Sequence, residues 1–251
     1  MPNQKLIQIQ TLEEISLNAL PCLQQILYDG WILRFAEGYT KRANSVTPLY
    51  PSTGDITQKI QRCEKIYHRF NLKPIFRLVN KSQLDLDRAL EQLGYAKQDS
   101  VSVQTIDIID SNISNNDLFP TIAYEISQEW LDRYVHAVDL PIQYWNTMAT
   151  MLEIIPHPTC YAWLKDRHRF CSCGLGVLEG SYLGLFFIAT AKKQRGRGYA
   201  RQLISAILDW GKHNGATKAY VQVETNNQSA INLYDKLGFT EVYQYFYRIK
   251  P

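Results

Sequence analysis

Hydrophobic residues along this chain follow a helical spacing and then a strand-like spacing, and the same succession occurs twice. Apolar side chains recur every three or four residues over Ile56–Phe70 and again over Leu203–Leu208, which predicts two amphipathic helices. Each is followed by a short run typical of a buried strand, Ile75–Val79 in the first half and Ala219–Val223 in the second. The pattern therefore predicts an α/β protein.

The two halves also agree in their spacing. Asp55–Val103 aligns without a gap with Tyr199–Tyr247, so that helix, strand, helix and strand follow in the same order. The second helix of each copy ends in Leu-Gly and an aromatic residue, and glycine is the usual residue just past a helix end. We therefore interpret the chain as two copies of one α/β unit.

A polar segment rich in turn-forming residues, Ser111–Asp117, separates the copies and predicts a linker. We expect one domain over residues 1–112 and another over 118–251. In the predicted fold class, each domain has a central mixed β-sheet flanked by helices.

Composition is that of an ordinary folded protein, with 251 residues of which 45% are hydrophobic and 20% charged. The start of the chain has no apolar leader, and the longest apolar run, Gly180–Ala191, is too short to span a bilayer. Five cysteines without a regular spacing are typical of reduced thiols. We expect a cytoplasmic protein that does not bind membranes.

The net charge of +3 is unevenly distributed. Five cations lie between positions 192 and 201 without an acidic residue among them, and acidic residues outnumber basic ones in the rest of the chain. This loop follows a predicted strand, Tyr182–Thr190, and precedes a helix that starts near Tyr199. Gly196 and Gly198 leave room for backbone N–H groups to approach an anion. A site for a small phosphate compound and a merely solubilising turn explain the loop equally well.

Two linked motifs favour the first interpretation. Arg195-Gly196-Arg197-Gly198-Tyr199-Ala200 resembles the acyl-CoA pyrophosphate loop of the GNAT superfamily of N-acyltransferases, and Ile188-Ala189-Thr190 resembles its splayed strand, which pairs with pantetheine. Asn227-x-x-Ala230-x-x-Leu233-Tyr234, followed by Lys236-Leu237-Gly238-Phe239, resembles its second motif. The resemblance covers about 122–251 and departs from the family in having Lys192 where proline is frequent.

The resemblance implies tandem GNAT-like domains with acetyl-CoA as co-substrate and no metal. It assigns contacts with CoA to Ile188, Ala189, Thr190, Arg195, Gly196, Arg197, Gly198, Tyr199, Ala200, Arg201, Asn227, Ala230 and Lys236. Tyr234 becomes the general acid for the leaving thiolate, while Glu224, or else Glu179, becomes the base. The purely structural alternatives are a helix cap for Asn227, a core aromatic for Tyr234 and solvated strand ends for the two glutamates.

The first copy lacks these residues. Arg195–Gly198 aligns with Pro51–Gly54, which carries no cation, and Tyr234 aligns with Leu90. The first half is therefore expected to be a catalytically empty GNAT-like domain, which leaves one CoA site per chain.

Two further groups of residues, a set of histidines and cysteines and a set of aromatic residues, can be explained by ordinary packing. The histidines and cysteines between His157 and Cys173 fall on a predicted hairpin, Cys160–Lys165 with Phe170–Leu178, with Cys171 and Cys173 on one face, so a metal site is not expected. In the family, the predicted helices in 128–154 would line the acceptor pocket. Three alternating tyrosines could also border it: Tyr243, Tyr245 and Tyr247.

Together these features predict an acetyl-CoA-dependent N-acetyltransferase that acts on a small-molecule or peptide amine by direct attack, as a monomer or homodimer. The alternative is a non-catalytic CoA-binding sensor or scaffold. Nucleic-acid binding is a weaker third hypothesis, because the basic loop has no interleaved aromatic residues and no second basic face.

Overall fold

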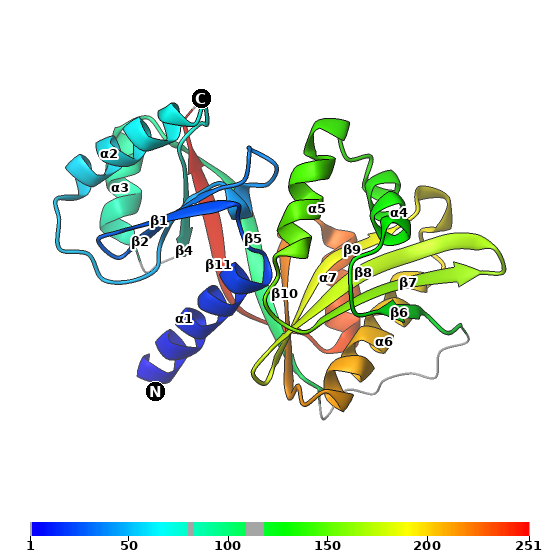
Figure 1. Cartoon of the computed structure of the whole chain (residues 1–251). Helices are drawn as coiled ribbons and strands as arrows, with labels where there is room; N and C mark the ends of the chain where they lie inside the picture. Colours follow the sequence, from blue (N-terminus) through cyan, green and yellow to red (C-terminus); the bar gives the residue numbers. More distant parts are fainter. Residues whose placement is uncertain (1, 80–82, 109–117, 251) are drawn as a thin grey trace. The chain divides into compact units, whose positions relative to one another are not determined.

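The computed structural model describes the whole chain except residues 1, 80–82, 109–117 and 251 (Figure 1). The chain divides into two compact units. The first comprises Met1–Val103, Glu224–Asn226 and Val242–Pro251, and the second comprises Gln104–Val223 and Asn227–Glu241. The predicted linker, Ser111–Asp117, lies outside the described residues.

The first copy of the repeat contains the following elements: α1 (Pro2–Ala19), β1 (Gln24–Tyr28), β2 (Trp31–Phe35), a 3-10 turn η1 (Lys41–Ala43), β3 (Val46–Pro48), α2 (Ile56–Arg69), β4 (Ile75–Val79), α3 (Leu84–Gln92) and β5 (Ala96–Asp107). Asp55 caps α2 by accepting a hydrogen bond from the Gln58 backbone N–H at 2.9 Å. The helix predicted over Ile56–Phe70 is therefore confirmed.

The second copy contains these elements: β6 (Thr121–Ala123), α4 (Gln128–Val138), η3 (Ile142–Tyr144), α5 (Trp145–Glu153), β7 (Thr159–Asp166), β8 (Arg169–Glu179), β9 (Tyr182–Thr190), η4 (Lys192–Gln194), α6 (Tyr199–His213), β10 (Lys218–Glu224), α7 (Gln228–Leu237) and β11 (Thr240–Ile249). The order β1-β2-β3-α2-β4-α3-β5 thus recurs as β7-β8-β9-α6-β10-α7-β11. The mixed α/β fold class and the repeat of elements are confirmed.

The two units do not follow the predicted division at 112 and 118, because β11 belongs from Val242 onward to the first unit and β5 is divided between the units after Val103. In the first unit the strand order is β1-β2-β3-β4-β11-β5, and β11 pairs antiparallel with β4 from Tyr245↔Val79 to Ile249↔Ile75. In the second unit the end of β5 lies beside β10, where the Ile108 N–H donates to the Thr217 carbonyl at 2.8 Å. The last strand of the second copy therefore completes the sheet of the first unit.

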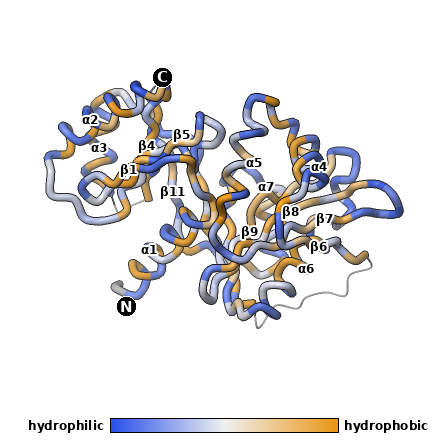
Figure 2. Tube along the Cα trace, viewed as in Figure 1, coloured by the Kyte–Doolittle hydropathy of each residue, from blue (hydrophilic) through white to orange (hydrophobic). Residues whose placement is uncertain are grey.

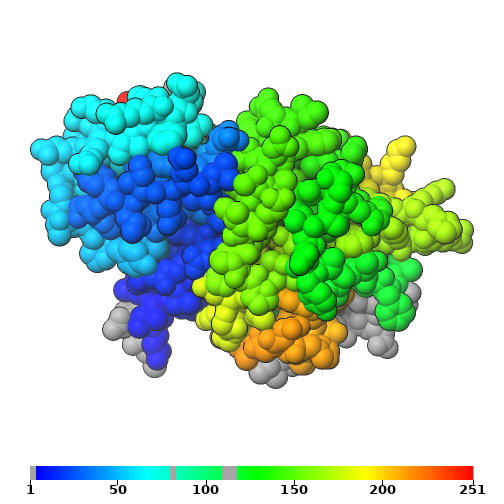
Figure 3. Space-filling view, viewed as in Figure 1, coloured from blue at the N-terminus to red at the C-terminus, as the bar shows by residue number. Residues whose placement is uncertain are grey.

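In the second unit the strand order is β6-β7-β8-β9-β10, with antiparallel pairs up to β9 and a parallel β9–β10 pair. Helices cover both faces of this sheet. On β7, Cys160 and Leu164 lie in the core that contains α6, whereas Tyr161 meets Trp130 of α4 with ring centroids 5.3 Å apart. Figure 2 shows the apolar character of β8 and β9, and Figure 3 shows α4 and α5 on the surface of this unit (green).

A β-bulge corrects one prediction about the cysteines. The register of β7 and β8 runs from Leu164↔Ser172 to Lys165↔Phe170, so Cys171 is the extra residue. Cys171 therefore packs with Cys160 in the core, while Cys173 lies opposite Trp163. Cys171 and Cys173 do not share a face as predicted. Over the described ranges, no three His, Cys, Asp or Glu side chains are grouped so as to hold a metal ion.

A buried polar cluster lies in the first unit. Arg77 pairs with Glu13 through both terminal nitrogens, one of them 2.8 Å from Glu13 Oε1, and Tyr243 also donates to Glu13. The Arg77 guanidinium lies 3.8 Å from the centre of the Tyr245 ring. Tyr243, Tyr245 and Tyr247 are all buried, and burial raises the pKa of Tyr243 well above its ordinary value. This side of β11 is packed into the first unit.

Among the helices of the described residues, none combines the length and the apolar character that a membrane span requires.

Candidate active site

The strands β9 and β10 separate partway along their length. Their parallel register extends from Tyr182↔Lys218 as far as Leu185↔Val221. Two residues later Phe187 has a φ of +52°, and the register of β8 with β9 shifts between Cys173 and Leu175. This irregularity is a β-bulge, which bends a strand and re-aims its side chains and backbone. The final residues of β9 are thereby placed along a cavity.

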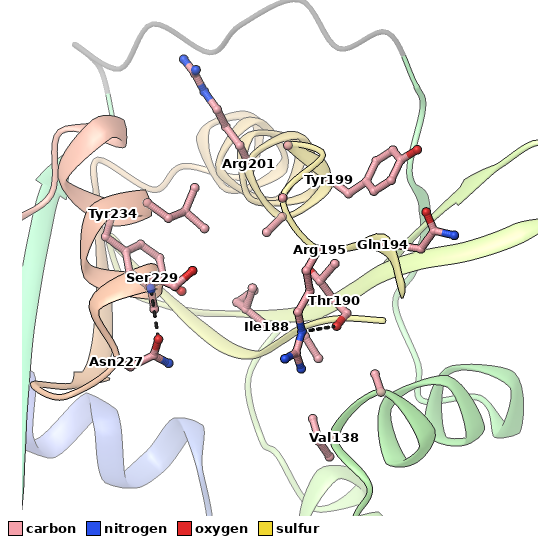
Figure 4. A pocket seen from close by; sticks show the side chains of 17 residues that line it. Val138, Ile188, Thr190, Gln194, Arg195, Tyr199, Arg201, Asn227, Ser229 and Tyr234 are labelled. Atoms are coloured by element: carbon pink, nitrogen blue, oxygen red, sulfur yellow. Dashed lines mark hydrogen bonds between the residues drawn. The ribbon is translucent and has the colours of Figure 1, made fainter. Parts of the chain in front are cut away.

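The cavity has a volume of about 460 Å³ and lies within the second unit (Figure 4). It is lined by the end of α4, the end of β9, the glycine-containing loop, the first turn of α6, and α7. The lining residues are Ala137, Val138, Ile188, Ala189, Thr190, Gln194, Arg195, Gly196, Gly198, Tyr199, Ala200, Arg201, Asn227, Ser229, Ala230, Leu233 and Tyr234. Most of the residues predicted to contact CoA are therefore brought together.

The backbone conformation of the loop requires glycine at two positions. Gly196 has a φ of +77°, and Gly198, the N-cap of α6, has a φ of +80°. A Cβ atom at either position would meet nothing within 4 Å, so the requirement is for the left-handed conformation and not for space. Gly198 starts α6 so that the N–H groups of its first turn, which have no partner within the helix, are directed to the cavity.

The five cations of the loop have different environments. Arg195 lines the cavity, and its Nε donates to the Thr190 carbonyl at 3.3 Å. Arg201 also lines the cavity, whereas Lys192 pairs with Asp139 just past α4. Arg197 lies in a neighbouring basic hollow beside the β7–β8 turn and does not line the cavity. The prediction that Arg197 contacts the pyrophosphate is therefore not matched by its position here.

Tyr199 contributes to the site through its backbone. Its side chain is turned away from the cavity (Figure 4), and its hydroxyl donates to Asp166 Oδ2 at 2.8 Å. The hydrogen bond with this carboxylate raises the pKa of Tyr199. The bond joins the first turn of α6 to the end of β7, so it holds the loop in place.

Helix α7 supplies the other wall. Tyr234 is only 5% exposed, lines the cavity and packs edge-on against Phe239, with ring centroids 5.4 Å apart. Asn227 Oδ1 accepts from the Ala230 backbone N–H at 3.1 Å, so Asn227 caps α7, which is the structural role considered for it from the sequence. Its amide group also lines the cavity, so the cap and a ligand contact are compatible. Tyr234 is likewise both a core aromatic and a cavity residue.

Besides Arg197, three predicted residues do not line the cavity. Lys236 is an exposed residue of α7, and Glu224 is exposed at the end of β10 and belongs to the first unit. Glu179 pairs with Tyr182 at the other end of β9. The eight steps from Tyr182 to Thr190 span about 26 Å of strand, so Glu179 is too far away to act as a base. Within the part of the chain that the structure describes, no carboxylate lines the cavity.

Sequence reasoning missed several cavity residues. Gln194 directly precedes the first motif, and Ser229 and Leu233 lie within the second, so all three are sequence neighbours of residues already predicted to bind CoA. Ala137 and Val138 come from α4, which was expected to lie on the acceptor side. Nothing in their residue type indicates a site.

Comparison with known proteins places these features in a family. Residues 121–239 match the model of the "Acetyltransferase (GNAT) family", and residues 7–156 match "Probable histone acetyltransferase Rv0428c C-terminal". An "Uncharacterized N-acetyltransferase YobR" of Bacillus subtilis is 30% identical, with 96% of this chain and 98% of the relative covered. A "Probable histone acetyltransferase Rv0428c" of Mycobacterium tuberculosis is 27% identical over 92% of this chain and 70% of its own length.

Solved structures share the fold. A GCN5-related N-acetyltransferase from Kribbella flavida superposes with a TM-score of 0.73 at 12% identity, covering 96% of this chain and 95% of its own. A tandem GNAT protein from the clavulanic acid biosynthesis pathway has a TM-score of 0.60 at 10% identity, covering 74% of this chain and 66% of its own. The chain therefore belongs to the GNAT family of N-acetyltransferases, in a tandem arrangement.

Proposed function

We propose that the cavity of the second unit binds acetyl-CoA and that the chain transfers the acetyl group to a primary amine. The observation that carries this proposal is that one cavity contains the glycine loop, an open length of β9 and the Tyr234 side chain. Each of these suits a different part of acetyl-CoA.

The binding chemistry follows from the lining residues. The N–H groups at the start of α6 and the Arg195 guanidinium suit the pyrophosphate of CoA. The backbone of Ile188 and Thr190, past the last β9–β10 pair, suits the amide groups of pantetheine as an added strand would. Asn227 retains its amide N–H₂ for a further contact, because only its oxygen is used in capping α7.

The reaction would be a direct attack. The neutral amine forms the N–C bond while the C–S bond breaks, and the Tyr234 phenol donates a proton to the departing thiolate. The attacking amine loses its own proton to water, because none of the described residues that line the cavity is a carboxylate. Tyr234 lines the cavity while most of its side chain is buried, which fixes the position of its phenol.

The test is release of free CoA thiol from acetyl-CoA with a panel of amines that includes basic peptides, since one relative is named a probable histone acetyltransferase. Tyr234→Phe should lower kcat with little change in acetyl-CoA affinity. Tyr182→Phe, at the opposite end of β9, is the matched control and should retain full activity. If the wild type binds CoA without turnover above background, the non-catalytic sensor replaces the enzyme.

A further inference from the structure

The first unit retains a loop equivalent to the glycine loop of the second unit, and a carboxylate of the same chain lies in it. Pro51–Gly54 aligns with Arg195–Gly198 and likewise connects a strand to the start of a helix, here β3 to α2. In both units the strand before the loop pairs parallel with the strand after the helix. The carboxylate that lies in the first unit's loop is that of Asp29, from the turn between β1 and β2.

Asp29 receives the contacts that a bound oxyanion would receive. The backbone N–H of Gly54 donates to Oδ2 at 2.9 Å, and that of Thr53 donates to both carboxylate oxygens at 3.1 Å. The hydroxyls of Ser52 and Thr53 each donate at 2.9 Å. Lys59 Nζ lies 2.8 Å from Oδ2. Lys59 and the loop N–H groups hold the pKa of Asp29 far below its usual range.

The hairpin turn is built to deliver this carboxylate. Asp29 and Gly30 both have positive φ, +43° and +81°, as in the two-residue Asp-Gly turns of β-hairpins. A Cβ on Gly30 would lie 2.3 Å from the Pro51 carbonyl oxygen, so only glycine lets the turn approach the loop. The N–H groups of Leu49 and Tyr50 donate to the Gly30 carbonyl at 3.2 and 2.9 Å. The turn and the loop are thus joined directly.

Lys59 gives the site a buried positive charge. Its side chain is only 2% exposed, and Nζ lies 4.0 Å from the centre of the Trp31 ring. Nζ also donates to the Asp29 carbonyl at 2.6 Å and to Ser52. A buried ammonium is costly unless it is paired with an anion. The aligned residue of the second unit is the core residue Leu203, so this cation is particular to the first unit.

The equivalent turn in the second unit carries the opposite charge. It connects β7 to β8, contains Arg167 with a φ of +58° and His168, and lines the basic hollow with Gln194 and Arg197. The hairpin of the first unit therefore places the Asp29 carboxylate against the loop N–H groups, whereas in the second unit the turn carries Arg167 and the nearby Asp166 accepts from the Tyr199 hydroxyl. This difference separates a loop that already holds an anion from one open to an external anion.

We propose that the first unit contains an anion-binding site which the chain's own Asp29 carboxylate occupies, and which would otherwise take a small oxyanion such as inorganic phosphate. The site is therefore closed to CoA, and the second unit alone keeps an open loop. This inference concerns the first unit and stands whether or not the second unit acetylates an amine.

The experiment is to remove the internal anion with Asp29→Ala and to supply inorganic phosphate, with chloride at equal ionic strength as the reference. The urea midpoint of Asp29→Ala should rise with phosphate, and with formate, by more than that of the wild type. In NMR spectra the amide signals of Thr53 and Gly54 should move with phosphate in the variant and stay in place in the wild type. The double variant Asp29→Ala with Lys59→Met removes the ammonium and should lose the phosphate effect.

Two results would overturn the proposal. One is a midpoint of Asp29→Ala that responds to phosphate no more than the wild type does. The other is movement of the Thr53 and Gly54 amides with phosphate in the wild type, which would show an open site. If Asp29→Ala fails to fold in chloride, recovery in phosphate or formate is the expected outcome. A failure to recover in either anion contradicts the proposal.

Discussion

Gly198 is the position where loop conformation and CoA binding are most directly linked. It caps α6 with φ +80° and ψ 0°, and a Cβ there would contact nothing within 4 Å. Replacement by alanine therefore adds no clash, and its cost is that of holding a residue with a Cβ in the left-handed region. That cost is about 1–2 kcal/mol.

The energy can be lost from folding or from binding. If the loop keeps its conformation, the free energy of unfolding falls by about 1–2 kcal/mol and CoA affinity is unchanged. If the loop relaxes to negative φ, stability recovers but the first-turn N–H groups turn away. Binding must then restore the strained form, so Kd rises roughly 5- to 30-fold, since 1.4 kcal/mol is tenfold. Because the loop is exposed, we expect the second outcome to dominate.

Calorimetric titration with acetyl-CoA and urea unfolding of Gly198→Ala measure both quantities. Gly215→Ala is the matched control, because Gly215 also has a positive φ of +95° with nothing within 4 Å but lies beyond the other end of α6. It should lose stability and keep its affinity. Unchanged affinity and unchanged stability in Gly198→Ala would refute the reasoning, as would an equal rise in Kd in Gly215→Ala.

Three more predictions concern the loop cations, the buried ion pair and the pH dependence. Arg195→Ala should raise the Kd for acetyl-CoA more than Arg197→Ala, since Arg195 lines the cavity and Arg197 does not; equal effects by calorimetry would argue against this assignment. Arg77→Met should lower unfolding free energy by about 3–5 kcal/mol because it leaves Glu13 buried without its cation. A loss below about 1 kcal/mol in urea unfolding would contradict it. Because the folded pKa of Asp29 is lowered, its stabilising effect is present above the unfolded pKa of about 3.9 and is lost as pH falls below it. Urea midpoints should therefore fall more steeply toward low pH in the wild type than in Asp29→Ala, and parallel curves would count against it.

The sequence predicted the elements well because hydrophobic period and helix stop signals are local properties. The helix over Ile56–Phe70 and the strand Tyr182–Thr190 were found with nearly their true bounds. It was also predictable that the glycine loop and Tyr234 would lie in one site, since each belongs to one of two linked motifs.

What the sequence left open depends on pairing between distant segments. The alternation in β11 predicts a strand, but nothing in it specifies β4 of the other copy as its neighbour. The bulge at Cys171 reversed the predicted face, because one extra residue shifts a period of two. The contact of Asp29 with Lys59 joins a hairpin turn to a helix thirty residues away, which no local pattern indicates.

The central claim is that the chain has one open acetyl-CoA site, in the second unit. Calorimetric titration of the wild type with acetyl-CoA measures it directly. We expect one molecule bound per chain, with the binding heat lost or strongly weakened in Arg195→Ala with Gly198→Ala. Binding of two molecules per chain, no binding at all, or binding that these changes leave intact would contradict the account.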